Sequence, residues 1–105
     1  MGLELGTTGA VSMESRVRVS EKSIKEEILE SEEKRKYTEA TISSRIENYS
    51  QLPVELHIDL EGMRLHKAEV SGFPYTHRLD EIEGTLIIRL ERVISAEITV
   101  DLLLS

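Results

Sequence analysis

A strict alternation of apolar and polar residues over positions 54–61 constrains the fold of this chain more than any other feature. Every second residue from Val54 to Leu60 is a branched aliphatic, and the positions between and after them are Glu55, His57, Asp59 and Glu61. Successive side chains of a β-strand point to opposite faces of its sheet, so the aliphatic residues share one face. The stretch therefore predicts a strand with one buried and one solvated face.

The residues that follow predict that this strand folds back on itself as a hairpin. Residues 62–64, Gly-Met-Arg, are expected to form its three-residue loop. The resulting register puts Asp59 opposite Lys67 on the solvent face. It also puts His57 opposite Glu69, so both pairs across the hairpin are favourable. A slip of one residue would turn the charged side chains into the core, and this register is therefore expected to win.

Similar alternation recurs in residues 37–48 and again near the end of the chain. The residues expected to face the core are Ala40, Ile42, Ser44, Ile46, Leu86, Ile88, Leu90, Ala96, Ile98, Val100 and Leu102. The last two segments are expected to form a second hairpin with Arg89 opposite Glu97. Residues 71–84 between the two hairpins are expected to be a connection, in which Phe73 and Tyr75 cap one end of the core.

The charged segment 21–36 fits two structures. Its residues are strong helix formers, and Ile24 and Ile28 have the i, i+4 spacing of a helix face. As a strand it would instead be a charged sheet edge, which discourages edge-to-edge aggregation. We favour the extended form because of a resemblance described below.

Length and composition indicate one small all-β domain. A chain of 105 residues has room for a single modest core. Its apolar residues are mostly Val, Ile and Leu, with one Phe, three Tyr and no Trp, which suits two sheets whose side chains interdigitate. The turn signals recur every 8–12 residues or so and predict an antiparallel, immunoglobulin-like β-sandwich of six to seven strands. We assign residues 15–105 to this domain and residues 1–14 to a flexible leader.

Charge and residue content argue against several classes of function. The formal net charge of −7 repels nucleic acid and anionic membrane surfaces, and the basic run 34–36 directly follows two glutamates. The lack of cysteine excludes disulfides, thiolate catalysis and zinc–thiolate sites. No apolar run is long enough to cross a bilayer, and the lack of a signal-peptide pattern favours a cytoplasmic location. Abundant Glu and Lys with few Asn and Gln point to a thermophilic source.

Two sequence features carry a resemblance to known domains. One is the passage "SSRIENYSQLPVELHI", in which a strand ends at an Asn and a polar turn leads to Pro-Val. The other is the late pair "GTLIIRL…AEITVDLLL". With these features, residues 23–104 resemble the immunoglobulin-like β-sandwich domains of mucoidy-inhibitor-A-like and archaeal cell-surface proteins. The resemblance implies an extended lead-in and a binding or structural module, and it supplies no catalytic residue.

The candidate ligand site lies on the polar face of the strand 54–60. His57 and Asp59 project from the same face, so they are the candidates for binding a metal or small ligand. A structural metal site needs three or four converging ligands, however, and a flat strand face makes its side chains diverge. We therefore expect neither a metal nor a cofactor there. The chain also lacks a Gly-x-Ser-x-Gly turn and a glycine-rich phosphate loop, and we expect it not to be an enzyme.

Aliphatic residues on the solvent side of the last hairpin form the candidate interaction surface, which consists of Ile87, Val93, Ile94 and Leu103. Exposed aliphatic groups that adjoin one another are usually covered by a partner, although a hairpin enclosed between two layers would also explain them. We expect a structural or protein-binding module that pairs with a protein partner or with itself through this hairpin. The alternative is a metal- or ligand-binding sandwich that uses His57 and Asp59.

Overall fold

All regular structure in the computed structural model is β-strand, and the described residues, 4–8, 11–28, 31–48 and 52–105, contain no helix. Within these ranges there are eight strands, so the expected count of six to seven was too low. The strands are β1 (Glu4–Thr8), β2 (Val11–Ile28), β3 (Ser31–Asn48), β4 (Val54–Asp59), β5 (Leu65–Ser71), β6 (Thr76–Asp80), β7 (Thr85–Leu90) and β8 (Ser95–Leu104).

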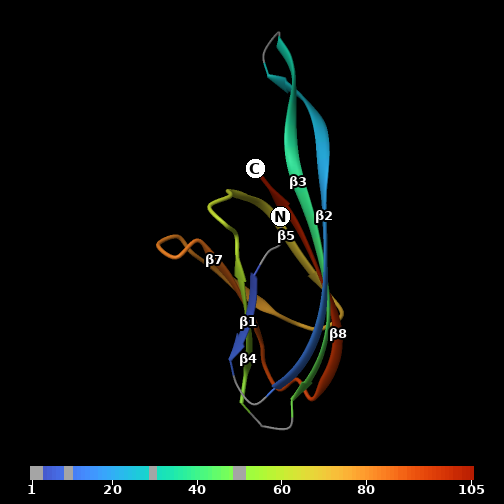
Figure 1. Ribbon diagram of the computed structural model, residues 1–105, viewed down its shortest axis with the longest axis vertical. Coiled ribbons are helices and arrows are strands. Elements are labelled where there is room, and N and C mark those ends of the chain that lie inside the picture. Colours follow the sequence, from blue (N-terminus) through green and yellow to red (C-terminus); the bar gives the residue numbers. More distant parts are fainter. Residues whose placement is uncertain (1–3, 9–10, 29–30, 49–51) are drawn as a thin grey trace.

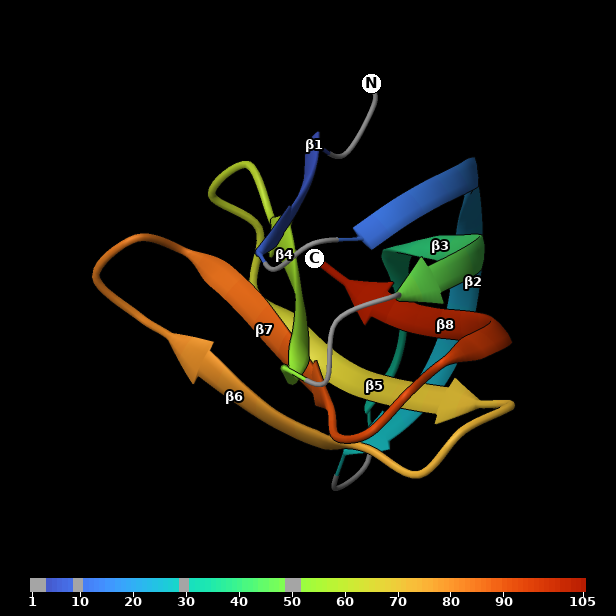
Figure 2. The same cartoon turned by 90° about the horizontal axis from the view of Figure 1, so that it is seen from below.

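The strands form two antiparallel sheets of four. Sheet A has the order β1-β4-β7-β6, and sheet B has the order β2-β3-β8-β5. Figure 2 looks along the length of the molecule and shows the two sheets on opposite sides of the core. The expectation of an all-β, antiparallel two-sheet architecture is confirmed.

Both predicted late hairpins were wrong about strand pairing. β4 pairs with β1 and β7, whereas β5 pairs with β8, so the chain crosses from one sheet to the other after β4. It crosses again between β7 and β8, and Arg89 therefore lies opposite Glu55 and not opposite Glu97. Alternation fixes which face of a strand is buried. Two strands can satisfy it by packing across the core as well as by lying side by side.

The core is built from the inner faces that the alternation predicted. Its buried residues are Ala40, Ile42, Ile46, Val54, Leu56, Ile58, Leu60, Val70, Leu86, Ile88, Leu90, Val93, Ile98, Val100, Leu102 and Leu104. Ser44 is buried among them, while Ala96 is only half-buried at the margin. The prediction of which side chains face inward is thus confirmed although the pairing was not.

Two segments that were expected to lack regular structure contain strands. Residues 1–14 were interpreted as a flexible leader, yet Leu5 in β1 and Met13 in β2 pack against the core. Both residues follow the period of two with their neighbours, which lets β1 pair with β4. Residues 71–84 contain β6, which pairs with β7. The caps expected in that segment are present, because Phe73 and Tyr75 both pack against the core.

The β2–β3 hairpin extends beyond the sandwich. β3 pairs with β8 only as far as Thr38, which lies opposite Leu104, while β2 and β3 continue to pair with each other up to Ile28 and Ser31. Figure 1 shows this two-stranded ribbon leaving one end of the molecule, whose longest extent is 55 Å. We call residues 23–28 and 31–36 the ribbon arm. The extended form favoured for residues 21–36 is confirmed in the described part, and the helix alternative was wrong.

Candidate functional site

The outer face of sheet A holds the two residues predicted as ligands. His57 lies in a row across the sheet with Gly6 of β1, Ile87 of β7 and Arg78 of β6. Asp59 lies in the next row on the same face, as the spacing of two predicts. Together these residues line a shallow, open hollow of about 560 Å³. The structure therefore brings His57 and Asp59 into one place.

Glu55 engages the cations around this hollow. Its Oε2 lies 3.8 Å from an Nη1 of Arg78 and 3.9 Å from that of Arg89. Its Oε1 lies 3.8 Å from Nε2 of His57, a buried nitrogen that has no hydrogen-bond partner among the described residues. Only 19% of the Glu55 side chain is exposed. The positive groups on this face are thus already turned toward a carboxylate of the chain itself.

The acidic residues of the hollow shape turns. Asp59 Oδ1 accepts a hydrogen bond of 2.9 Å from the backbone N–H of Glu61. Asp80 Oδ1 accepts bonds of 3.1 Å from the backbone N–H groups of Ile82 and Glu83. Short carboxylates commonly stabilise turns in this way. The residues that the structure describes contain no group of three or more side chains placed to hold a metal ion.

The four residues of the predicted interaction surface do not form one surface. Val93 is 1% exposed and belongs to the core, and Ile87 is 6% exposed between its neighbours His57 and Arg78. Because β7 and β8 lie in different sheets, Ile87 and Leu103 occupy the outer faces of opposite sheets. Leu103 is half-buried. The expectation that these residues adjoin one another depended on the hairpin, and it was wrong with it.

Ile94 is the member of that set that the structure leaves accessible, with 76% of the residue exposed. Its carbonyl oxygen accepts a 2.8 Å hydrogen bond from the backbone N–H of Asn48. The side chain of Asn48 donates a 2.9 Å bond to the carbonyl of Leu52, which is 62% exposed. The buried Asn48 thus ties two loops with exposed aliphatic residues together at the end of the sandwich away from the ribbon arm.

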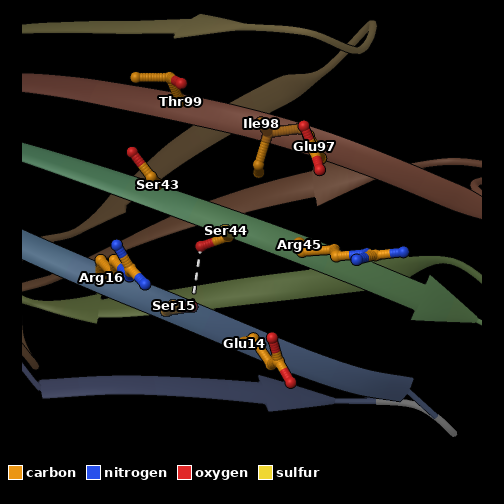
Figure 3. Close-up of a pocket in the computed structure, with 9 residues that line it drawn as sticks. All are labelled: Glu14, Ser15, Arg16, Ser43, Ser44, Arg45, Glu97, Ile98 and Thr99. Carbon is orange, nitrogen blue, oxygen red and sulfur yellow. Dashed lines mark hydrogen bonds between the residues drawn. The ribbon is translucent and has the colours of Figure 1, made fainter.

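The outer face of sheet B has a second shallow hollow, of about 520 Å³. Figure 3 shows its polar lining. The small residues Ser43 and Thr99 lie beside each other in the centre, and the longer side chains of Glu14, Arg16, Arg45 and Glu97 surround them. One cross-strand row places Glu14, Arg45 and Glu97 in sequence, so the charges alternate in sign across β2, β3 and β8.

The open edge of β2 borders this hollow. Among the described residues, β2 pairs with β3 alone, and its other side has no strand. On the outer face Glu14, Arg16 and Arg18 are exposed, and in the part of the chain described neither Glu14 nor Arg16 has an ion pair. On the inner face Val17 is 37% exposed although its partner Ile42 is buried. The edge therefore offers unpaired backbone, unpaired charge and an incompletely covered aliphatic row.

Sequence reasoning identified only part of this edge. Val17 and Val19 were interpreted as a short strand signal, but the alternation begins earlier, at Val11 and Met13. Treating the first fourteen residues as a leader hid that continuity. The strand could have been found from this alternation, whereas its position at the edge of a sheet could not.

No family model, curated protein or solved structure matches this chain. In the residues that the structure describes, no helix has the length and apolar content needed to cross a bilayer.

Proposed function

We propose that this chain is a non-enzymatic structural module of immunoglobulin-like type that associates with further copies of itself by pairing at a sheet edge. The observation that carries the proposal is the open edge of β2, an 18-residue strand with a continuous register against β3. A row of unpaired backbone N–H and C=O groups is a template for pairing with another strand.

The other three edges of the sandwich show the usual protections against such pairing. β1 and β6 are short, with five residues each. β5 has a register shift between Leu65 and Lys67, where a bulge interrupts its pairing with β8. Short edge strands and bulges are among the ways in which proteins prevent edge-to-edge association. The long regular edge of β2 has neither protection, which favours a use for it.

The two hollows support a non-enzymatic role. Catalytic sites are mostly enclosed pockets in which a few polar groups converge on a substrate. Both hollows here are shallow and open, and the carboxylates of the first, Asp59 and Asp80, form hydrogen bonds to turn backbone. The polar groups of these surfaces stabilise the sandwich itself.

The mass in solution tests the proposal. Size-exclusion chromatography with light scattering, across about a hundredfold range of concentration, is expected to show a species of 23.8 kDa, twice the 11.9 kDa of one chain, that increases with concentration. The double variant Ile87→Lys/Leu103→Lys tests whether the outer faces of β7 and β8 contribute instead. A chain that stays monomeric over the whole range would refute self-association.

A second candidate function is the binding of a small ligand or metal in the hollow of sheet A. The observation that favours it is that His57 and Asp59 line the same hollow and that Nε2 of His57 has no hydrogen-bond partner among the described residues. A ligand that binds only the native state raises the melting temperature. Titration with Zn²⁺ or Ca²⁺ would therefore raise it in the wild type and not in His57→Ala. An unchanged melting temperature in both proteins would remove this candidate.

A further inference from the structure

We infer that two copies of this chain pair antiparallel along β2, with Ser15 of one copy opposite Ser15 of the other on a twofold axis. The two copies of sheet B would then form one continuous eight-stranded sheet. This inference rests on the proposed function, because it names the surface and the register through which the module associates. It follows from the sequence of residues along the open edge.

Symmetry and the two faces of β2 limit the possible registers to a few. In a twofold pair each copy uses the same surface, so the register is defined by the residue that lies on the axis. A shift of one residue in pairing would place the aliphatic face of one strand beside the charged face of the other. The axis must therefore pass through a residue, and moving it by one residue along β2 shifts the pairing by two.

With the axis at Ser15, opposite charges meet on the outer face. Glu14 of each copy lies opposite Arg16 of the other, so this attractive pair occurs twice. Both side chains are exposed and without an ion pair in the described part of the single chain. Arg18 lies opposite Ser12, which is neutral. Opposite-charge pairs directly across antiparallel strands are stabilising.

The inner face matches in the same register. Val17 of each copy lies opposite Met13 of the other, and Val19 lies opposite Val11. Within one chain Val17 is 37% exposed at the sheet edge, and Met13 and Val19 are half-buried. A second β2 strand would cover Met13, Val17 and Val19 from the open side. The same register thus satisfies both faces of the strand.

Neighbouring registers oppose like charges. An axis at Glu14 puts Glu14 against itself, and an axis at Arg16 puts Arg16 against itself. An axis at Val17 puts Arg16 against Arg18 twice, and one at Arg18 again pairs identical charges. Like charges directly opposite each other destabilise a strand pair. Among the five axes from residue 14 to residue 18, Ser15 gives attractive pairs without a repulsive one.

The charge pattern would continue across the joined sheets. Within one chain Glu97, Arg45 and Glu14 form a row of alternating sign on the outer face. In the proposed pair the next member of that row is Arg16 of the second copy. Each Glu14 then lies between two arginines, and the row has no charge facing another of its own sign. The outer hollow of Figure 3 borders this junction on both copies.

Charge reversal at this edge tests the register. Glu14→Arg alone sets two arginines against each other at both crossings and is expected to weaken dimerisation about ten- to a hundredfold, and Arg16→Glu should act in the same way by opposing two glutamates. An equal mixture of these two single variants restores attractive pairs, so it should form a heterodimer although neither variant forms a homodimer. Arg18→Glu is the matched control, since it changes the charge by the same amount opposite a neutral serine.

Light scattering on the single variants, on the mixture and on the control gives the masses, and circular dichroism confirms that each variant is folded. Dimerisation of the mixture alone supports the register. A wild type that dimerises while Glu14→Arg dimerises as well would overturn the register and leave self-association standing. A monomeric wild type would overturn both.

A cysteine cross-link gives an independent measurement. Directly opposed residues of antiparallel strands have Cα atoms about 4.5–5.5 Å apart, within the range that a disulfide spans. The chain has no cysteine, so Ser15→Cys introduces a single thiol that would face its own copy. In the control Val17→Cys the two thiols would be about 13 Å apart along the strands. Oxidation should cross-link Ser15→Cys and not Val17→Cys, and the reverse result would contradict the axis.

Discussion

The β2–β3 hairpin has two halves that share the same strands and differ in what surrounds them. In the half formed by residues 11–22 and 37–48, β3 is flanked by β8 and the inner face packs on sheet A. In the ribbon arm, the same two strands pair only with each other. The seated half alternates apolar and polar residues, whereas the sequence of the arm is mostly Glu, Lys and Arg. Third strands and a covered face, more than hairpin pairing, are therefore expected to hold β2 and β3 in place.

The largest effect should come from the inner face of the seated half. Ile42 is 1% exposed in the middle of β3, between Val17 of β2 and Val100 of β8. Ile42→Ala removes buried methyl groups and leaves a cavity, so it should lower the free energy of unfolding by about 2–5 kcal/mol. Chemical denaturation measures this change. A loss below about 1 kcal/mol would mean that the core closes over the site, contrary to the packing described.

The end of the seated half should show the next largest effect. Asn48 is 2% exposed, and its side chain donates a hydrogen bond to the carbonyl of Leu52. Asn48→Ala leaves that carbonyl without its donor, which should lower the free energy of unfolding by about 1–3 kcal/mol. Asn48→Asp is the matched variant, because it keeps the size of the side chain and removes the donor. A stability equal to the wild type in both variants would contradict the role assigned to this bond.

Removal of the ribbon arm should have a small effect on stability. Lys22 lies opposite Tyr37, so an Asn-Gly turn in place of residues 23–36 would close the hairpin in its present register. The sandwich should keep its free energy of unfolding within about 1 kcal/mol, because two-stranded pairing alone is marginal in water. Thermal and chemical denaturation of the shortened chain test this. A loss of several kcal/mol would show that the arm stabilises the sandwich.

The smallest effect is expected on the outer face of the seated half. Thr41 donates a 2.9 Å hydrogen bond to Oδ1 of Asp101 on the exposed side of β3 and β8. Thr41→Val keeps the branched shape and removes the donor, and exposed hydrogen bonds exchange readily with water. The free energy of unfolding should change by no more than about 0.5 kcal/mol. A larger loss, measured as for Ile42→Ala, would remove the distinction between the two faces.

The sequence predicted the faces of the strands much better than their neighbours. Alternation placed Leu56, Ile88 and Val100 in the core, because burial of one face imposes a period of two on any strand. It did not reveal that β4 and β5 belong to different sheets, since strands that face each other across a core show the same pattern as strands that lie side by side. Pairing depends on contacts between distant segments, which local patterns do not specify.

The candidate sites followed the same division. His57 and Asp59 were expected on one face, and they line one hollow. The surface of Ile87, Val93, Ile94 and Leu103 required a hairpin between β7 and β8, and without it these residues separate into the core and two outer faces. The edge of β2 was missed because edges arise from sheet order, which a single strand does not encode.

The position of β8 in sheet B has a consequence for how the chain is made. β3 lies early in the sequence, yet its second neighbour is β8, whose residues 95–104 leave the ribosome many tens of residues later. Until then the inner row around Ile42 has no strand beside it, and β4 similarly waits for β7. Such distant pairings slow folding and leave aliphatic strands accessible to chaperones during synthesis.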